Sequence, residues 1–440
     1  MKKLSVKTKR VLAAVSAVVL LCGTFFLGFK SREWFMNPAA AKLDEILKLI
    51  EDNYDGEFDR DKFIASAVSG TLDRYSTYYT ESEYKETEDR HQGINKGKLG
   101  VSFYTGTNRI YSVAGNSPAE KAGITSGEIV GIKAADESEY TVVSDFETFS
   151  EKYSVFELDE EFFVRIKNGE DVAEYKVKKS DYVESYVWYK DFSGSYGLTL
   201  NKGVWRLEKL GYSLPVDVKE GYAYIKFSSF YGEAENQMEK ALEKMKETGI
   251  KKVVLDLRKN GGGYMNVFCG ISRFFCPGKS GQPTAIARYT KSSYTFCAPK
   301  SANRYDDFAF ENIALLMDSG SASASEALAG AILDYDEKYN KNIVKIVLAD
   351  SVAVNSDGDE ETVFRSYGKG IMQTTFTLSD GSAIKMTTAH ILWPVTKKTI
   401  HGSGITTATD EKRVFNVKSV EGKDAQAEFA MRRRNRKTRV

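Results

Sequence analysis

The chain has 440 residues, with 62 Lys and Arg against 61 Asp and Glu, a formal net charge of +1 and a hydrophobic content of 42%. This balanced charge gives no global attraction for nucleic acid, so no nucleic-acid partner is expected. Length and apolar content together predict two or three domains, each with a hydrophobic core.

The first segment predicts a membrane anchor. A basic segment, residues 1–10, precedes residues 11–29, which carry no charge. A helix of that length nearly spans the hydrocarbon core of about 30 Å. Because the heavier basic cluster lies before the span, we expect an uncleaved single-pass cell-membrane protein with a cytoplasmic N-terminus and an extracytoplasmic catalytic part. A cleaved signal peptide ending near Ala39-Ala40-Ala41, or a lipid-modified Cys22, are the alternatives.

The next region, residues 41–97, predicts two amphipathic helices, over 41–53 and 61–72. In the second helix the residues expected to face inward are Phe63, Ile64, Ala67, Val68 and Leu72. Residues 74–84 are rich in Tyr, Ser and Thr and are expected to form a loop, followed by a polar hinge over 85–98. The helices could pair subunits in a homodimer, although apolar faces at this spacing more often pack in a core.

Short strands and turns alternate over residues 98–180. Strands are expected at 99–103, 109–113, 128–132, 162–166 and 172–177, with a short helix after Ser117 and a longer one over 146–153. This order resembles a PDZ domain. In that family, the loop matched by Leu99, Gly100 and Val101 receives the terminal carboxylate of a peptide on its backbone amides.

A glycine turn follows a predicted buried strand at 251–257 and precedes a predicted helix at 264–275. Its sequence is Arg258-Lys259-Asn260-Gly261-Gly262-Gly263. Glycines let a backbone amide face a substrate, which suits an oxyanion donor, whereas the Gly-Lys-Ser/Thr of a phosphate loop is missing. Taken alone, the turn is better explained as a plain connection.

A second turn contains only small residues between a predicted strand at 313–317 and a predicted helix. Its serines are Ser321, Ser323 and Ser325, and Glu326 follows them. A hydroxyl near a helix N-terminus, among small neighbours, has the surroundings that a nucleophile needs. Helix capping explains the serines about as well, so the functional interpretation requires a base elsewhere in the chain.

Two kinds of base are available. The three histidines lie in the polar hinge (His91), in a predicted strand (His390) and in a glycine loop (His401). Lys369 lies between two glycines ahead of a strand predicted at 372–378. Burial can lower the pKa of a lysine enough for it to act as a base, although an exposed turn is the more common explanation of Gly-Lys-Gly. On the residues alone, both kinds of base remain open.

These motifs together closely resemble the carboxyl-terminal processing peptidases, which are PDZ-containing Ser/Lys serine peptidases of the tail-specific protease type. The resemblance covers residues 41–407 and rests on the serine turn, Gly368-Lys369-Gly370 with Gln373, Asp256-Leu257-Arg258 with its glycine turn, residues 378–385 and Thr387-Thr388-Ala389. It implies that Ser323 is the nucleophile, that Lys369 is the general base, oriented by Gln373, and that the amides of Gly262 and Ala324 form the oxyanion hole.

The resemblance also implies a multi-domain α/β fold. After the transmembrane helix come the helical region 41–97, a PDZ domain at 98–180, a peptidase core of the crotonase-like (ClpP/crotonase) type at 181–410 and a basic tail at 411–440. Family members cut proteins near their C-termini, with the PDZ domain catching the tail, and no metal or cofactor is implied. Two departures, Gly261 in place of a usual proline and an insertion around 335–365, motivate a catalytically impaired PDZ scaffold as the alternative.

Overall fold

The computed structural model describes residues 37–54, 56–300, 304–354 and 359–432. The chain divides into two compact units, residues 1–71 and 72–440. The predicted membrane span, residues 11–29, lies outside the described residues. Within the described ranges, no helix combines the length and apolar character that crossing a bilayer requires.

The described part of the first unit consists of α2 (Pro38–Asn53) and α3 (Arg60–Thr71). The side chain of Asn37 caps α2 by accepting the N–H of Ala39 at 2.9 Å. Neither helix buries a residue, so the prediction that Phe63, Ile64, Ala67, Val68 and Leu72 face inward is wrong: two short helices enclose too little surface to cover an apolar face.

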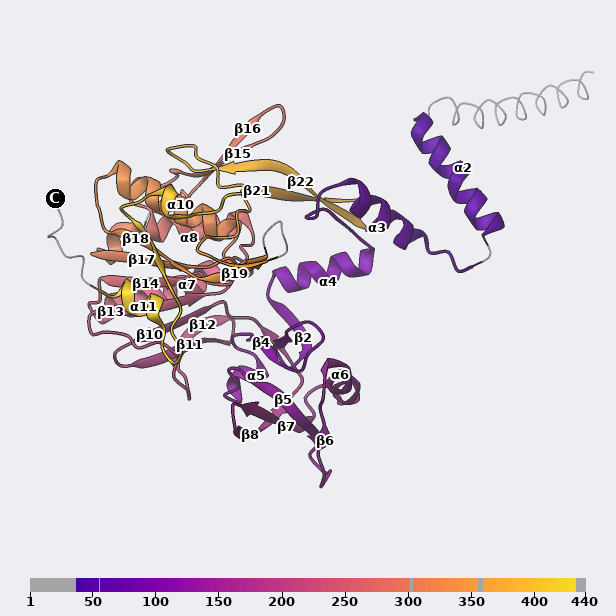
Figure 1. Cartoon of the computed structure of the whole chain (residues 1–440), viewed down its shortest axis with the longest axis horizontal. Coiled ribbons are helices and arrows are strands. Elements are labelled where there is room, and N and C mark those ends of the chain that lie inside the picture. Colours follow the sequence, from indigo (N-terminus) through magenta and orange to yellow (C-terminus); the bar gives the residue numbers. More distant parts are fainter. Residues whose placement is uncertain (1–36, 55, 301–303, 355–358, 433–440) are drawn as a thin grey trace, which may run out of the picture. The chain divides into compact units, whose positions relative to one another are not determined.

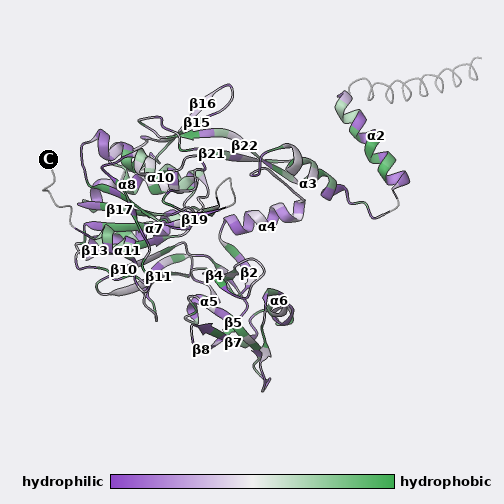
Figure 2. Ribbon diagram, in the orientation of Figure 1, coloured by the Kyte–Doolittle hydropathy of each residue, from purple (hydrophilic) through white to green (hydrophobic). Residues whose placement is uncertain are grey.

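An eight-stranded sheet forms the centre of the second unit (Figure 1). Five strands run parallel, in the order β13 (Tyr222–Phe227), β14 (Lys252–Asp256), β17 (Asn312–Met317), β18 (Val344–Ala349) and β23 (Val414–Val417). Antiparallel strands β10 (Val187–Asp191), β11 (Gly194–Asn201) and β12 (Val204–Lys209) extend it beyond β13. Apolar residues predominate in the central strands (Figure 2), as expected for parallel strands buried on both faces.

Helices cover both faces of this sheet. The larger core joins Val253 and Leu255 to α7 (Ala234–Glu247), α8 (Met265–Phe275) and α10 (Ala324–Lys338). On the other face, Val254 packs in a cluster that includes α11 (Ala425–Ala430). The prediction of a tail over 411–440 is therefore wrong for its described part, because β23 and α11 bury apolar side chains on the sheet.

A second sheet carries the segment after Lys369. It contains β21 (Ile371–Thr377), β22 (Ala383–Leu392), β15 (Pro283–Arg288), β16 (Ser293–Cys297) and β1 (Thr77–Tyr79). β1 pairs with β22, with Thr77 opposite Lys385. It leads into α4 (Glu81–His91), where Thr80 and Glu83 form a capping box. The loop and hinge predicted over 74–98 are therefore wrong, because the partner strand lies far along the chain and gives no local signal.

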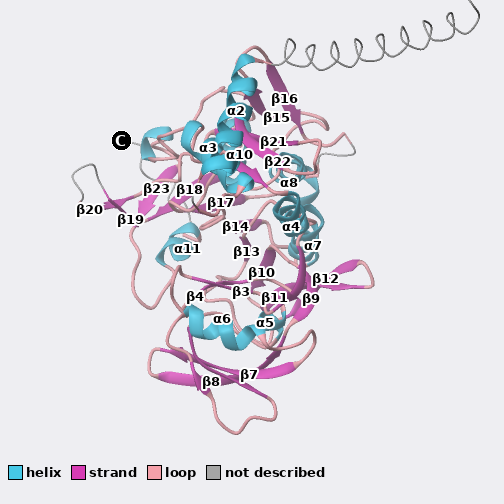
Figure 3. Ribbon diagram, turned by 90° about the vertical axis from the view of Figure 1, so that its right-hand side faces the viewer, coloured by secondary structure: helices cyan, strands magenta, loops and turns pink. Residues whose placement is uncertain are grey.

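Residues 98–180 form a β-rich domain with its own hydrophobic core (Figure 3). The chain enters through β2 (Ile94–Lys98) and leaves through β9 (Ser180–Val183), which pair antiparallel. The domain contains β3 (Val101–Phe103), β4 (Ile110–Val113), α5 (Pro118–Lys121), β5 (Glu128–Ala134), β6 (Thr141–Val142), α6 (Phe146–Ser154), β7 (Glu161–Asn168) and β8 (Asp171–Lys178). Elsewhere in the unit lie α9 (Tyr305–Phe308), the hairpin of β19 (Ser351–Val354) and β20 (Glu360–Val363), and η1 (Thr407–Thr409).

A buried carboxylate joins this domain to the central sheet. Glu120 on α5 accepts hydrogen bonds from the Trp188 indole N–H, from the Tyr212 hydroxyl at 3.0 Å and from the Asn116 N–H at 2.6 Å. A charge removed from water needs such partners, so the domain is held to β10 through a fully bonded group.

Candidate active site

The turn between β17 and α10 places its three serines in different surroundings. Ser321 Oγ donates to the Leu257 carbonyl and Ser325 Oγ donates to the Asn260 carbonyl, both at 2.8 Å, and both serines are buried. Ser323 is half-buried and lines a cavity. Ser321 and Ser325 therefore fasten the turn to the glycine loop, and Ser323 faces the space where a substrate could lie.

The backbone at Ser323 is strained. Its φ of +57° and ψ of −113° lie where residues with a Cβ are rarely found. Gly262, with φ +100°, packs directly against it: a Cβ on Gly262 would lie 2.8 Å from Ser323 Cβ and 2.9 Å from Ala324 N. The glycine loop and the serine turn approach so closely that only glycine fits at this position.

Glu326, on the first turn of α10, links the serine turn to the lysine loop. Its Oε2 accepts the Ser323 N–H at 3.0 Å, and its Oε1 accepts the Gly368 N–H at 2.8 Å and the Ser366 hydroxyl. Burial raises the pKa of Glu326, although these hydrogen bonds favour the ionised form. The capping-box spacing Ser323-x-x-Glu326 is the one sequence signal for this role of Glu326.

Lys369 lies in the loop that precedes β21. It lines the same cavity as Ser323. Its Nζ lies 5.0 Å from the centroid of the Tyr75 ring. No hydrogen bond joins Lys369 Nζ to Ser323 Oγ in the described part of the chain. The structure therefore brings the predicted nucleophile and base into one cavity without a hydrogen bond between these two described side chains.

The surroundings of Lys369 favour its neutral form. Burial is the main cause that lowers the pKa of the amine, and the positive charge of Lys385 acts in the same direction. Asp73 and Glu326 oppose the shift through their negative charges. The net direction is downward, which is the direction that a lysine base requires.

The two predicted oxyanion donors differ in availability. Ala324 N–H, at the first residue of α10, donates to no acceptor among the described residues. Gly262 N–H already donates to Asn260 Oδ1 at 2.9 Å. The side chain of Asn260 therefore occupies the Gly262 amide in this conformation, and the role of Gly262 as an oxyanion donor stays a prediction.

Gln373 lies on β21 and also lines the cavity. Its Nε2 donates to Thr387 Oγ1 at 3.1 Å, across the β21–β22 pair in which these residues face each other. No described hydrogen bond connects Gln373 to Lys369. Its role in orienting the lysine therefore stays a prediction.

The cavity has a volume of about 500 Å³ and two unlike walls. Apolar side chains form much of the lining: Met265, Ala327, Ile371, Met372, Ile391, Trp393 and Ile400. α4 contributes a polar part with Glu88 and His91, and Lys385 adds a second cation. The arrangement can accommodate an apolar side chain beside a nucleophile and a titratable amine.

Of the three histidines, His91 is the one that lines this cavity, while His390 and His401 do not. His91 stacks on Tyr231, with ring centroids 4.7 Å apart, and its Nδ1 lies 2.8 Å from the Tyr264 hydroxyl. Burial lowers the pKa of His91. His91 therefore lies on α4 at the cavity wall and not in the predicted hinge, a position that no local sequence pattern indicates.

The predicted peptide-binding loop lies in the β-rich domain. Leu99 is buried and its N–H donates to the Tyr153 hydroxyl of α6 at 2.9 Å. Gly100 has φ +88° and packs on Ser117, where a Cβ would come within 2.2 Å of Ser117 Cβ. Val101 begins β3.

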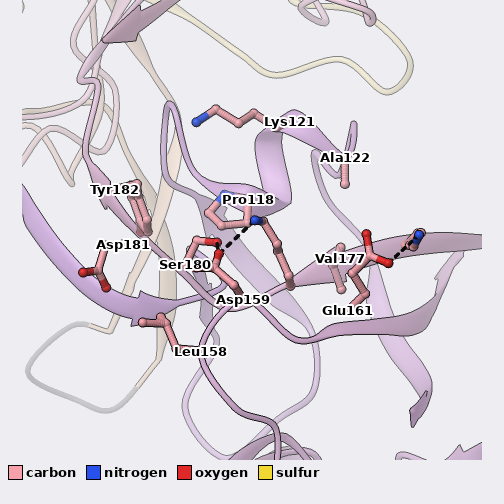
Figure 4. Close-up of a pocket in the computed structure, with 12 residues that line it drawn as sticks. Pro118, Lys121, Ala122, Leu158, Asp159, Glu161, Val177, Ser180, Asp181 and Tyr182 are labelled. Atoms are coloured by element: carbon pink, nitrogen blue, oxygen red, sulfur yellow. Dashed lines mark hydrogen bonds and ion pairs between the residues drawn. The ribbon is translucent and has the colours of Figure 1, made fainter. Parts of the chain in front are cut away.

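A second cavity, of about 580 Å³, lies in the same domain between α5 and the β8–β9 segment (Figure 4). Pro118 and Lys121 of α5 face Ser180 and Tyr182 across it. The carboxylates of Asp159 and Glu161 are paired with Lys178 and Lys176, at 2.8 and 2.6 Å. The predicted peptide-binding residues do not line this cavity.

Comparison with known proteins relates the chain to one group of serine peptidases. Residues 221–338 match the model of peptidase family S41. The chain is 26% identical over 380 residues to the "Probable CtpA-like serine protease" of Staphylococcus aureus (strain COL), and 24% identical over 371 residues to the protein of that name from Staphylococcus saprophyticus. The chain is thus similar to CtpA-like serine proteases, and its residues 221–338 match peptidase family S41.

The two staphylococcal relatives are longer proteins. The matches cover 83% of the chain but 63% and 64% of the relatives' lengths. Among solved structures, the photosystem II D1 C-terminal processing protease aligns over 82% of this chain and 84% of its own, with 18% identity and a TM-score of 0.42. The S41 match spans β13 to α10, and so includes the glycine loop and Ser323.

Proposed function

We propose that the chain is a serine endopeptidase with Ser323 as nucleophile and Lys369 as general base, which cuts extracytoplasmic proteins near their C-termini. One observation carries the proposal: Ser323 and Lys369 line one cavity, and the carboxylate of Glu326 bonds both of the segments that carry them. The S41 match over residues 221–338, which includes Ser323, supports the same chemistry.

The reaction follows from these positions. The neutral amine of Lys369 takes the proton from Ser323 Oγ as the oxygen attacks a peptide carbonyl, and then gives that proton to the leaving amine. Water, activated by the same lysine, hydrolyses the acyl-enzyme. The reaction requires Nζ and Oγ to come within about 2.6–3.2 Å of each other, a distance that is often longer without substrate.

The N–H of Ala324 would donate to the oxyanion at the N-terminus of α10, where the helix dipole adds to the stabilisation. Gly262 becomes the second donor when its N–H leaves Asn260 Oδ1. The Oε1 of Gln373 would accept a hydrogen bond from the Lys369 ammonium and hold it toward Ser323.

Recognition of the substrate tail is assigned to the β-rich domain as a PDZ domain. The amides at Leu99, Gly100 and Val101 would receive a terminal carboxylate, which must replace the Tyr153 hydroxyl at the Leu99 amide. Residues 11–29 would hold the enzyme at the cell membrane, because they form an uncharged run behind a basic segment.

A catalytically impaired PDZ scaffold is the second candidate. The occupied Gly262 amide and the missing Ser323–Lys369 hydrogen bond favour it. In that case the chain binds C-terminal peptides without cutting them, and Lys369→Ala leaves binding unchanged.

Labelling with a biotinylated fluorophosphonate separates these functions. We expect wild type to be labelled and to hydrolyse peptides, Ser323→Ala to lose both properties, and Lys369→Ala to lose 10²–10⁴-fold in rate. Ser319→Ala is the control from the same turn. Labelling or hydrolysis that persists in Ser323→Ala refutes the nucleophile, and loss of activity in His91→Ala with activity kept in Lys369→Ala would assign the base to the histidine.

A further inference from the structure

Residues 73–79, here called the tyrosine strap, lie against both lysines of the cavity. The Tyr75 ring centroid lies 5.0 Å from Lys369 Nζ, and the Tyr79 ring centroid lies 5.4 Å from Lys385 Nζ. Lys385 Nζ also donates to the Tyr79 hydroxyl at 2.9 Å. The strap therefore places one aromatic ring on each amine.

The position of the strap is fixed by backbone pairing and by a local turn. β1 pairs with β22 in a register that sets Thr77 opposite Lys385. Before β1, Asp73 Oδ1 accepts the Tyr75 N–H at 3.0 Å and the Ser76 hydroxyl at 2.9 Å. The backbone of Tyr75 is thus held by the Asp73 turn before it and by the paired strand β1 after it.

The hydroxyl end of Tyr75 is also anchored. It accepts a hydrogen bond from Arg74 Nη2 at 2.8 Å and donates one to the Tyr367 hydroxyl at 3.4 Å. Tyr367 precedes Gly368 and Lys369 in the same loop. Hydrogen bonds therefore hold both the backbone and the hydroxyl of Tyr75, and the hydroxyl bonds to the loop that carries Lys369.

A ring in this position has two opposing effects on an amine. Its face attracts a cation, which favours the ammonium, and its bulk keeps water away, which favours the neutral amine. Burial is the main cause of the lowered pKa of Lys369, and the Tyr75 ring, 5.0 Å from Nζ, is part of the surroundings that cover the amine. The charged groups that face the amine are Lys385 from β22, Asp73 from the strap and Glu326 from α10.

We propose that Tyr75 is a positioning residue for the general base, whose ring shields Lys369 Nζ from water and keeps the amine able to accept a proton. The inference rests on the proposed role of Lys369 and adds a residue from outside the S41 match. It also gives the strap, which precedes the β-rich domain in the chain, a part in the chemistry.

The test measures the amine directly. The pH dependence of Lys369 acetylation by trace acetic anhydride, followed by mass spectrometry of the peptide, gives its pKa in any variant, including Ser323→Ala. Tyr75→Ala should move the Lys369 titration about one pH unit to the alkaline side, a partial loss of the burial effect. Tyr75→Leu keeps apolar cover and should not move it upward. Tyr294→Ala removes an exposed tyrosine of β16 and serves as the control.

Peptidase activity gives a second readout. A one-unit shift lowers the neutral amine about tenfold near pH 7, so kcat of Tyr75→Ala should fall about tenfold there and recover at alkaline pH. An unchanged or acid-shifted Lys369 titration in Tyr75→Ala overturns the inference, as does lost activity that high pH does not restore. Hydrolysis that survives in Ser323→Ala counts against the proposed function instead, because the acetylation readout does not depend on it.

Discussion

Glu326 Oε2 accepts the backbone N–H of Lys369 at 2.9 Å. The same oxygen accepts the N–H of Ser323 at 3.0 Å, so a single atom sets the spacing between the nucleophile segment and the base segment. Since Glu326 is buried, no water can easily take over these bonds. The carboxylate is therefore a fixed reference point for two segments that lie far apart in the chain.

Replacing Glu326 by Gln should lower kcat at least tenfold while KM changes little. The amide has one acceptor oxygen where the carboxylate has two, so several donors lose a partner, and a lost bond to a charged group costs about 1.5–3 kcal/mol. Steady-state kinetics and the midpoint of thermal unfolding measure the two effects.

Glu337→Gln is the matched control for Glu326→Gln. It lies on the same helix, and its exposed side chain pairs with Arg413. The control should keep wild-type kcat. Equal loss of activity in both variants would mean that helix stability, not the link between segments, accounts for the effect.

Lys385→Met should move the acidic limb of the pH–kcat profile to higher pH. Lys385 repels the Lys369 ammonium and lowers the pKa of that amine, so removing the charge lets the pKa rise. Activity requires the neutral amine, and the variant should therefore need more alkaline conditions for the same rate. The pH–kcat profiles of wild type, Lys385→Met and the exposed control Lys291→Met test this prediction. A shift of the Lys385→Met profile toward lower pH contradicts it.

Arg258→Ala should destabilise the core by about 3–5 kcal/mol, the cost of breaking a buried ion pair. Arg258 Nη2 pairs with Asp424 at 2.6 Å, and its Nε donates to Asp256 Oδ1 at 2.9 Å. Asp256 is buried, and although burial opposes its ionisation, Arg258 holds the pKa of that carboxyl below its usual value. Without the guanidinium, Asp256 becomes an unpaired buried charge.

Urea unfolding measures that loss, and Asp424→Asn provides the comparison. The Asp424 side chain caps α11 by accepting the Ala427 N–H at 2.9 Å, and the amide can keep this bond. Asp424→Asn should therefore cost less than Arg258→Ala. A cost for Asp424→Asn as large as that for Arg258→Ala would contradict this expectation.

Glu184 should make the free energy of unfolding fall as pH rises from about 4.5 to about 7. Burial raises the pKa of Glu184 to about 7, against 4.5 for the ordinary group. Below the lower value both states are protonated; between the two values the unfolded chain loses its proton first, which favours unfolding. The effect is roughly 3 kcal/mol, at about 1.4 kcal/mol per pKa unit, and levels off above pH 7.

Glu184→Gln should remove this dependence and be more stable than wild type at pH 8 but not at pH 4. Denaturant titrations of both proteins at the two pH values give the difference directly. Parallel pH curves for wild type and variant would contradict the assignment.

The sequence predicted the elements whose signals are local. The apolar run before Asp318 and the small-residue helix after Ser323 correspond to β17 and α10, and the glycine turn after Asp256 lies beside them as expected. Helix α6 was predicted at 146–153 and spans Phe146–Ser154. In each case hydrophobic periodicity or a glycine-rich turn lies within a short stretch.

The elements that were missed depend on distant partners. β1 is short and polar-flanked, and only its pairing with β22 makes it a strand. Val414 and the alanines of α11 gave no signal near a strongly basic segment, yet they are buried on the sheet. The links made by Glu326, and the use of the Gly262 amide by Asn260, likewise follow from tertiary contacts that no local pattern contains.

Two paired strands, β2 and β9, connect the β-rich domain to the rest of its unit. β2 follows almost directly on α4, whose Glu88 and His91 contribute to the cleft that holds Ser323. The β2–β9 pair is therefore the connection between the β-rich domain and α4. A displacement of β2 would therefore reach the wall of the cavity through covalent backbone.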